Sequence, residues 1–223
     1  EYTITEPDQL SATANTTPVT CLGDSDGSVE LVIEGGTGPY DIDWQGINPL
    51  VVPVGTYIAI VTDDNECILP VEYTITEPEE LSATANVIPA LCFGEANGLV
   101  ELNITGGIGP YDTNWQGVNP LAVSAGTYTA IVTDDNECIL PVEYTITEPD
   151  QLSAAANTIP ALCFGEANGS VELVIAGGVG PYDTNWQGIN PLAVSAGTYI
   201  AIVTDDNECV LPVEYTITEP DQL

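Results

Sequence analysis

The sequence contains no lysine, arginine or histidine, whereas 34 of its 223 residues are aspartate or glutamate. Binding to DNA or RNA requires cationic side chains that replace the phosphate counterions. The absence of cations therefore excludes a nucleic-acid partner and electrostatic docking on anionic lipid. The formal net charge of −34 favours solubility and opposes side-by-side association of chains.

The sequence also lacks several features that intracellular, membrane-spanning or catalytic proteins commonly have. Trypsin-like proteases have no residue to cut after, and there is no methionine to oxidise. No apolar run approaches the roughly 18 residues that cross a bilayer, so we expect no membrane insertion. Without histidine or lysine, a serine lacks its usual activating base, and we expect no enzymatic activity. These features suit an extracellular, non-catalytic protein.

The sequence is dominated by one long repeat. The heptapeptide EYTITEP begins at Glu1, Glu72, Glu143 and Glu214, a period of 71 residues. A unit of this length is a domain rather than a rung of a solenoid. Because the chain opens within the pattern, we expect it to be an excerpt of a longer protein. The predicted division is the end of a preceding repeat (1–7), repeat 1 (8–78), repeat 2 (79–149), repeat 3 (150–220) and the start of a further repeat (221–223).

Each repeat is predicted to be an all-β domain, because short β-branched and aromatic runs alternate with Gly, Pro, Asn and Asp clusters. Comparison of the copies indicates which strand face is buried: Val29, Leu31 and Ile33 stay apolar in every copy, whereas Val32 becomes Asn103. The fold class expected is a series of tandem Ig-like β-sandwich domains arranged as a linear fibre. The strands expected in repeat 1 are Leu10–Ala14, Ser28–Glu34, Tyr40–Trp44, Leu50–Val54, Thr56–Thr62 and Val71–Thr76.

Two cysteines per repeat predict disulfide bonds formed in an oxidising compartment. The six are Cys21, Cys67, Cys92, Cys138, Cys163 and Cys209. The favoured pairing lies within each repeat, Cys21–Cys67 and its two copies, and each bond would contribute about 4 kcal/mol in the chain-entropy model. A bond across the junction, Cys67–Cys92, is the alternative. A zinc site is disfavoured, because there is no histidine and no Cys-x-x-Cys pair.

A set of motifs recurs in every copy. In repeat 1 it comprises Cys21, the run GGTGPY at 35–40, Trp44, GTY at 55–57 and VTDDNEC at 61–67, followed by ITEP. In combination these motifs resemble the SprB-type repeat of very large cell-surface adhesins in gliding Bacteroidota. The resemblance implies an Ig-like sandwich, export by the type IX secretion system and a place on the cell surface. The sequence departs from the family pattern at Glu66, where glycine commonly precedes the cysteine.

Three acidic segments are candidate sites, each with a simpler alternative. The DDNE run at 63–66 could bind Ca²⁺ through carboxylate oxygens, or it could form a solvated hairpin turn. The segment Asp24–Gly27 also hints at calcium, but its copies have Glu, Ala and Asn. Asp41, Asp43 and Trp44 could form a sugar platform or a catalytic carboxylate pair, but Asp43 becomes Asn in the copies and Trp44 suits the core.

The junction between repeats, at 77–80, is short and contains Pro78, which predicts a stiff joint and a semi-rigid rod. We therefore expect a structural stalk or filament of a secreted, cell-surface adhesin, with gliding or surface attachment as candidate roles. The alternative is a Ca²⁺-dependent array that binds ligands or glycans. The partners expected are neighbouring repeats of the chain, other fibre chains, and surface or glycan ligands.

Overall fold

The structure, a computed structural model, describes residue 2 and residues 5–222. These residues form strands and no helix, which confirms the all-β class and leaves no helix that could cross a membrane. The predicted flanking segments 1–7 and 221–223 lie partly outside the described residues. Repeat 1 contains β1 (Ser11–Thr17), β2 (Ser28–Glu34), β3 (Asp41–Asp43), β4 (Gly55–Thr62) and β5 (Ile68–Ile75).

The same five strands recur in the other two copies. Repeat 2 contains β6 (Ser82–Ile88), β7 (Leu99–Thr105), β8 (Asp112–Asn114), β9 (Gly126–Thr133) and β10 (Ile139–Ile146). Repeat 3 contains β11 (Ser153–Ile159), β12 (Ser170–Ala176), β13 (Asp183–Asn185), β14 (Gly197–Thr204) and β15 (Val210–Ile217). Every strand is displaced by one sequence period from its equivalent, so the sequence repeat is also a structural repeat.

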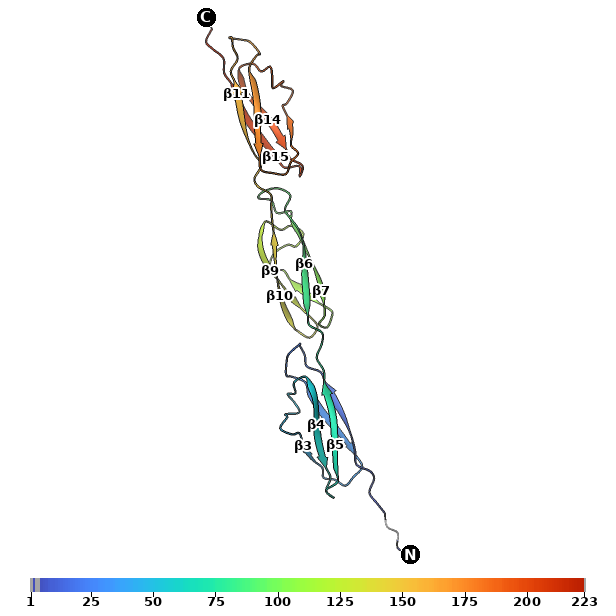
Figure 1. Cartoon of the computed structure of the whole chain (residues 1–223). Helices are drawn as coiled ribbons and strands as arrows, with labels where there is room; N and C mark the ends of the chain where they lie inside the picture. The colour runs from blue at the N-terminus through green and yellow to red at the C-terminus, as the bar shows by residue number, and fades with distance from the viewer. Residues whose placement is uncertain (1, 3–4, 223) are drawn as a thin grey trace. The chain divides into compact units, whose positions relative to one another are not determined.

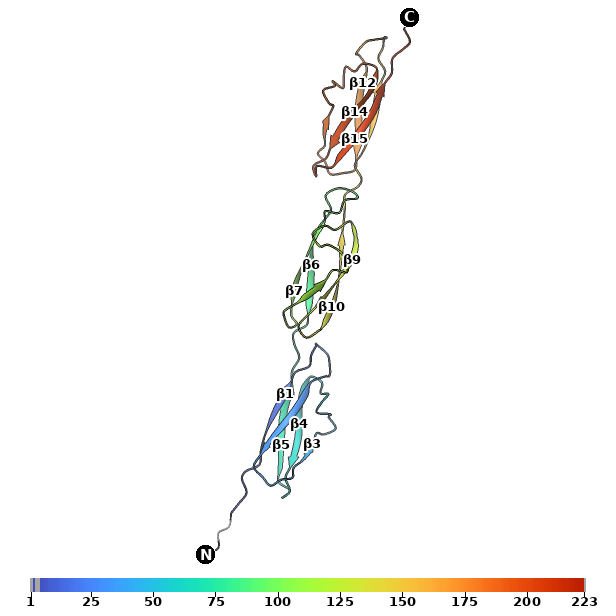
Figure 2. The ribbon, with the colours of Figure 1, turned by 180° about the vertical axis from the view of Figure 1, so that it is seen from behind.

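Each repeat contains two small antiparallel sheets. In repeat 1, β1 pairs with β2 so that Ser11 is opposite Glu34, and β4 pairs with both β3 and β5 in the second sheet (Figure 1). Strand β1 of the first sheet lies beside β5 of the second (Figure 2). The two sheets form the β-sandwich predicted from the strand pattern.

The core of repeat 1 lies between these sheets. Buried side chains come from both of them, and Trp44 and Tyr57 pack against the cluster from the side. Tyr73 is a buried member of the cluster, with its ring stacked on Tyr57 at 5.6 Å and edge-on to Trp44 at 6.0 Å. The predicted inward face of β2 and the assignment of Trp44 to the core are confirmed. The buried residues of this cluster are Val19, Val29, Val52, Ala59, Tyr73 and Ile75.

One predicted strand is wrong. Leu50–Val54 forms a loop in which Val52 makes a single bridge to Gly27. The same single bridge forms in the other two repeats, where serine replaces Pro53, so the segment pairs through one residue in every copy. Val52 is nevertheless fully buried, so its apolar character reflects the core rather than a strand.

The chain divides into two compact units that do not follow the sequence repeats. The first contains Glu1–Thr84, Leu102–Asn114 and Ala130–Val142, and the second contains Ala85–Glu101, Trp115–Thr129 and Glu143–Leu223. Residues of repeat 2 are therefore shared between the units. The domain boundaries at 78/79 and 149/150, and the arrangement as a linear fibre, stay predictions.

The buried tyrosine of the core yields a first prediction. The hydroxyl groups of Tyr73, Tyr144 and Tyr215 are buried and have no hydrogen-bond partner. An unpartnered buried polar group costs about 1–3 kcal/mol. Replacing all three tyrosines by Phe should therefore raise the free energy of unfolding by about 1 kcal/mol per repeat, measured by urea denaturation.

The stacked tyrosines provide a matched control for this experiment. The hydroxyl of Tyr57 donates a 3.1 Å hydrogen bond to the carbonyl of Pro53, and its equivalents in the other repeats donate to the carbonyl of the corresponding serine. Tyr57→Phe, Tyr128→Phe and Tyr199→Phe should lower stability by about 1 kcal/mol each. Equal losses of stability in both variant sets would contradict the finding that the Tyr73 hydroxyl has no hydrogen-bond partner.

Candidate functional site

The disulfide bonds connect cysteines of different repeats. Cys21 of repeat 1 is bonded to Cys138 of repeat 2, and Cys92 of repeat 2 is bonded to Cys209 of repeat 3. Both bonds have a sequence separation of 117 residues, and each lies within one compact unit. The favoured pairing within repeats is therefore wrong.

The remaining two cysteines, Cys67 and Cys163, are free and exposed in this structure. The rival pairing Cys67–Cys92 is not formed either, because Cys92 bonds to Cys209. Four of the six cysteines predicted to form disulfides therefore do so, with partners that neither sequence interpretation assigned.

The length of strand β5 explains why the two cysteines of repeat 1 cannot bond. Cys67 immediately precedes β5, whereas Val19, close to Cys21, donates to the carbonyl of Thr76 just beyond the other end of that strand. Eight strand residues span about 26 Å. A disulfide needs Cα atoms within about 7 Å of one another, so the two cysteines lie at opposite ends of the sandwich.

The loop with the first cysteine of each repeat (residues 18–27, 89–98 and 160–169), here the first-cysteine loop, is held at the Glu-Pro end of that repeat. In repeat 1, Gly23 N donates to Glu77 Oε2 at 3.2 Å. The loop is closed by Asp26, which accepts bonds from the Thr20 amide and hydroxyl. Asn97 and Asn168 replace Asp26 and accept the same amide bond through Oδ1 at 2.8 Å. The position of Asp26 therefore needs an oxygen acceptor, not a charge, which accounts for its replacement by asparagine in the copies.

The second cysteine ends a hairpin turn, the second-cysteine loop (residues 63–67, 134–138 and 205–209). In repeat 1, a β-turn forms where Glu66 N donates to Asp63 O at 3.0 Å, and Asp63 N donates to Cys67 O at 3.1 Å. Glu66 has a φ of 64°, the left-handed conformation that follows the turn in three-residue hairpin loops. Glycine adopts this conformation without steric cost, whereas glutamate carries that cost here.

The Asp63 carboxylate organises this loop. Its Oδ1 accepts the amides of Asn65 at 2.9 Å and Cys67 at 2.8 Å, and its Oδ2 accepts the amide of Thr37 at 3.0 Å. Asp63 is 4 % exposed, and Asp134 and Asp205 repeat the arrangement at 5 %. The first residue of the DDNE run is thus a buried structural acceptor.

The second-cysteine loop adjoins the point at which the chain enters its repeat. Gly107 N donates to Glu79 O at 2.9 Å, and a Cβ on Gly107 would approach Asp134 Oδ2 to 2.7 Å. Its φ of 58° also favours glycine. The Gly-Gly pair therefore lets the entering chain lie close to the loop of Asp134.

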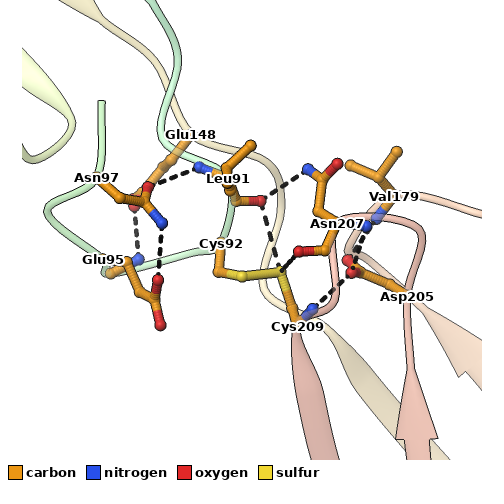
Figure 3. The surroundings of a disulfide bond; sticks show 10 residues. Leu91, Cys92, Glu95, Asn97, Glu148, Val179, Asp205, Asn207 and Cys209 are labelled. Atoms are coloured by element: carbon orange, nitrogen blue, oxygen red, sulfur yellow. Dashed lines mark hydrogen bonds between the residues drawn. A yellow bond between two sulfur atoms is a disulfide. The ribbon is translucent and has the colours of Figure 1, made fainter. Parts of the chain in front are cut away.

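The two loops meet beside the linker between sequence repeats. In the first unit, Asn136 Nδ2 donates to Thr20 O at 3.0 Å, and Cys138 Sγ lies 3.5 Å from the same oxygen. Figure 3 shows the second unit, where Asn207 Nδ2 donates to Leu91 O at 2.8 Å beside the Cys92–Cys209 bond. An asparagine two residues before the cysteine thus positions each linkage with a hydrogen bond.

Hydrogen bonds, burial and a neighbouring charge shift the pKa values of groups in this loop. Backbone bonds, first that of Cys67 and then those of Thr37 and Asn65, hold the pKa of Asp63 below its ordinary value although desolvation opposes them. Desolvation is the largest influence on Asp134, but amide bonds from Ile108, Cys138 and Asn136 together lower its pKa. The negative charge of Asp63, followed by desolvation and a hydrogen bond to Asp63, raises the pKa of the Cys67 thiol.

The other acidic candidates have local structural contacts. Among the described residues, no group of three or more His, Cys, Asp or Glu side chains has an arrangement that could hold a metal ion. Asp43 accepts the Gln45 amide at 2.8 Å and its side-chain nitrogen at 2.6 Å, and Asn185 accepts the equivalent amide at 2.9 Å. These contacts explain why Asp and Asn are interchangeable at this turn.

Sequence reasoning missed the asparagine of the DDNE run and the junction at which the linkages form. One signal could have located the junction. Cys67 precedes the last predicted strand of its repeat, so it is a full strand away from the following Glu-Pro. The sequence did not show whether the first cysteine lies near the Glu-Pro end of its repeat or near the opposite end.

A comparison with protein families finds one match in part of each repeat. The family model described as SprB repeat matches the chain at residues 13–49, 84–119 and 155–190. Each match begins in the first strand of a repeat and ends after its third, so it includes the first-cysteine loop but not the second-cysteine loop. No curated protein matches the chain.

The lowered pKa of Asp63 generates a prediction about acid stability. Because its pKa in the folded state is below the unfolded value of about 3.9, ionised Asp63 stabilises the fold above that pH. This contribution is lost as the pH falls through the folded pKa. Asp63→Asn should therefore lower the melting temperature at neutral pH, and its difference from the parent chain should shrink below about pH 4.

Asp64→Asn is the matched control, since Asp64 is exposed and the substitution removes the same charge. Its melting temperature should equal that of the parent chain at both neutral and acid pH. A difference between Asp63→Asn and the parent chain that is equally large at neutral and at acid pH would contradict the role assigned to the ionised carboxylate.

The left-handed glutamate generates a second prediction. Glu66→Gly, Glu137→Gly and Glu208→Gly should together raise the free energy of unfolding by about 0.5–1 kcal/mol per repeat, measured by urea denaturation, because glycine removes the steric cost of positive φ. The same change at the neighbouring residues should destabilise the chain, because these aspartates do not have a positive φ and glycine loses more conformational entropy on folding. These residues are Asp64, Asp135 and Asp206. Stabilisation by both sets would argue against relief of backbone strain.

Proposed function

Because the chain carries SprB repeats at three tandem positions, we propose that it is a structural stalk of a cell-surface adhesin, in which disulfide bonds connect consecutive repeats. SprB repeats are typical of cell-surface proteins, which supports an extracellular location. The disulfides support it as well, because such bonds persist in oxidising compartments. Gliding and surface attachment are the roles that we propose for the whole adhesin.

The observation that carries this proposal is the pairing of cysteines across repeats. Cys21–Cys138 spans the linker at 77–80, and Cys92–Cys209 spans the linker at 148–151. Each linker is therefore accompanied by a second covalent connection. A cut in either linker leaves the flanking repeats joined, which is a useful property for a stalk exposed to proteases and to tension.

The constancy of the DDNE run also favours a stalk over a ligand-binding array. An array would keep exposed residues for its ligand, whereas the first and third residues of this run and the following cysteine have structural partners. Asp134 holds the hairpin, Asn136 positions the linkage and Cys138 forms it. The first and third residues of the run and the cysteine after it therefore have roles internal to the chain, and no particular observation favours Ca²⁺ or glycan binding.

The composition is consistent with the same function. A chain without lysine or arginine offers trypsin-like proteases no site, and its net charge of −34 opposes clumping of neighbouring stalks. We propose no catalytic role. Its partners in this interpretation are further repeats of the same kind, with ligand binding assigned to other parts of an adhesin.

Cleavage of one linker tests the proposal. The recognition site of a sequence-specific protease is inserted between Pro78 and Glu79, and the oxidised chain is cut. The fragments should migrate as one species without reductant and as two with it, because Cys21–Cys138 holds them together. The same insertion with Cys138→Ser should give two fragments under both conditions.

Peptide mapping of the disulfide bonds in the unmodified chain shows whether the inserted protease site has altered the pairing. The unmodified chain, digested by a Glu-specific protease without reduction, should yield one cross-linked peptide pair with Cys21 and Cys138 and another with Cys92 and Cys209. Recovery of a Cys21–Cys67 peptide, or separation of the cut fragments without reductant, would overturn the proposal.

A further inference from the structure

The first-cysteine loop ends in the dipeptide Asn-Gly in two of the three repeats. Asn97-Gly98 and Asn168-Gly169 are the two Asn-Gly pairs of the sequence, and Asp26-Gly27 is their equivalent in repeat 1. Asparagine is thermolabile, and a following glycine has no side chain to hinder attack of its backbone nitrogen on the asparagine side chain. These two pairs are therefore the positions of the chain most reactive toward deamidation.

The fold of the loop needs both residues of the pair. A Cβ on Gly98 would lie 2.7 Å from Ile146 Cγ2 and 2.8 Å from Val123 O, and the equivalent glycine of repeat 3 is confined in the same way. The residue before it supplies the oxygen that closes the loop, since Asn97 Oδ1 accepts the amide of Leu91 at 2.8 Å. Asn-Gly thus meets two structural requirements, and its chemical reactivity accompanies them.

The attacking nitrogen is held in a hydrogen bond beside the core. Gly98 N donates to Val123 O at 3.0 Å, and Val123 N donates to Gly98 O at 2.9 Å. Gly169 and Val194 form the same bridge at 3.0 Å and 2.8 Å, and both valines are 1 % exposed. Attack requires the glycine amide to lose its proton and turn toward the asparagine side chain. Both steps break the bridge, so the closed loop opposes the reaction.

The side chain under attack is held at both of its polar atoms. Oδ1 of Asn97 accepts the Leu91 amide, and Nδ2 donates to Glu95 Oε2 at 2.8 Å (Figure 3). The bond from Leu91 polarises the side-chain carbonyl and by itself would favour attack at its carbon. The protection in the closed loop therefore comes from the position of the glycine nitrogen, not from the asparagine carbonyl.

Repeat 1 shows what an aspartate needs at this position. Asp26 accepts both the amide and the hydroxyl of Thr20, and the hydroxyl bond is the largest influence that lowers the pKa of Asp26. Repeats 2 and 3 have leucine at the position of Thr20, so an aspartate there would lack the hydroxyl donor. In repeat 2 it would also lose the bond to Glu95 and place two carboxylates side by side, which repel each other.

We propose that Asn97 and Asn168 are deamidation sites that the closed first-cysteine loop keeps unreactive through the glycine bridges, and that deamidation after the loop opens hinders it from closing again. A reversible opening of the loop then becomes an irreversible one. Repeat 1 has no asparagine at this position and pairs its aspartate with Thr20, so its loop does not undergo this change.

The reaction needs only water. The glycine nitrogen loses its proton and bonds to the side-chain carbonyl carbon of asparagine, and the bond from that carbon to the amide nitrogen breaks. The amide nitrogen takes up the proton and leaves as ammonia, so that a succinimide ring remains. Water opens the ring at either carbonyl and gives aspartate or isoaspartate. Isoaspartate adds one atom to the backbone, which displaces the glycine from its bridge.

Deamidation rates in the whole oxidised chain test the first half of the proposal. The chain is incubated at mildly alkaline pH, in buffer and in enough urea to unfold it, and peptides from a Glu-specific digest are examined by mass spectrometry. Both asparagines should react at least about thirtyfold more slowly in buffer, the factor that two net hydrogen bonds contribute. Hydrogen exchange at Gly98 and Gly169 should be slowed similarly, because exchange needs the same opening.

Three valine variants show whether each bridge protects its own site. Val123→Ala loosens the bridge of repeat 2 and should accelerate deamidation of Asn97 while Asn168 is unchanged, and Val194→Ala should do the reverse. Val52→Ala, in the repeat without an Asn-Gly pair, should change neither rate. Equal rates in buffer and urea, or a variant without effect at its own site, would overturn the proposal. So would deamidation in buffer that outpaces exchange of the glycine amides.

Asn97→Asp tests the second half of the proposal by supplying the product directly. It should speed hydrogen exchange at Gly98 by about fivefold, the factor of one net hydrogen bond. Adding Leu91→Thr should restore slow exchange, because threonine supplies the hydroxyl that Asp26 uses in repeat 1. Leu91→Thr alone should not slow exchange below the parent rate. Unchanged exchange in Asn97→Asp, or no rescue by threonine, would overturn the claim that deamidation hinders closure.

Discussion

The absence of any cationic side chain is the constraint on which the structure depends. With 34 acidic residues and no Lys, Arg or His, no carboxylate can form a salt bridge to a side chain, so a buried carboxylate must be stabilised by N–H donors. Asp63 meets this requirement with three backbone amides. Glu77 does so at the surface by accepting the amide of Gly23. Asp63 and Glu77 are therefore bound to the backbone, and they fix the shapes of loops.

These hydrogen bonds between carboxylates and the backbone position the two loops that carry the cysteines. Glu77 and its copies hold the first-cysteine loop at the end of a repeat, whereas Asp134 and its copies hold the second-cysteine loop where the chain enters one. Both loops adjoin the same linker, and the asparagine of the second contacts a carbonyl of the first. The disulfide between repeats is thus a consequence of how two acceptors arrange the backbone, and the cysteines add a covalent bond to loops already in contact.

The sequence predicted the repeat, the all-β class and the buried faces well, because these depend on local alternation of side chains. Val29 and Leu31 kept their apolar character across copies for the same reason that they face the core. The strand expected at Leu50–Val54 was wrong because apolar character indicates burial and does not specify pairing. The disulfide partners could not be obtained from spacing: Cys21 is closer in sequence to Cys67 than to Cys138, and only the length and direction of β5 exclude the nearer partner.

The pairing across repeats changes what the disulfides stabilise. A bond within a repeat would restrain the unfolded state of that repeat alone, whereas Cys21–Cys138 closes a loop with a sequence separation of 117 residues, for which the chain-entropy model gives about 5 kcal/mol. That contribution is shared by parts of two repeats and their linker. The core of each repeat, built around Tyr73 and its stacked partners, must therefore maintain its own fold. Reduction of the bonds should then free the junctions before it unfolds the sandwiches, so connection between repeats and folding of each repeat depend on different residues.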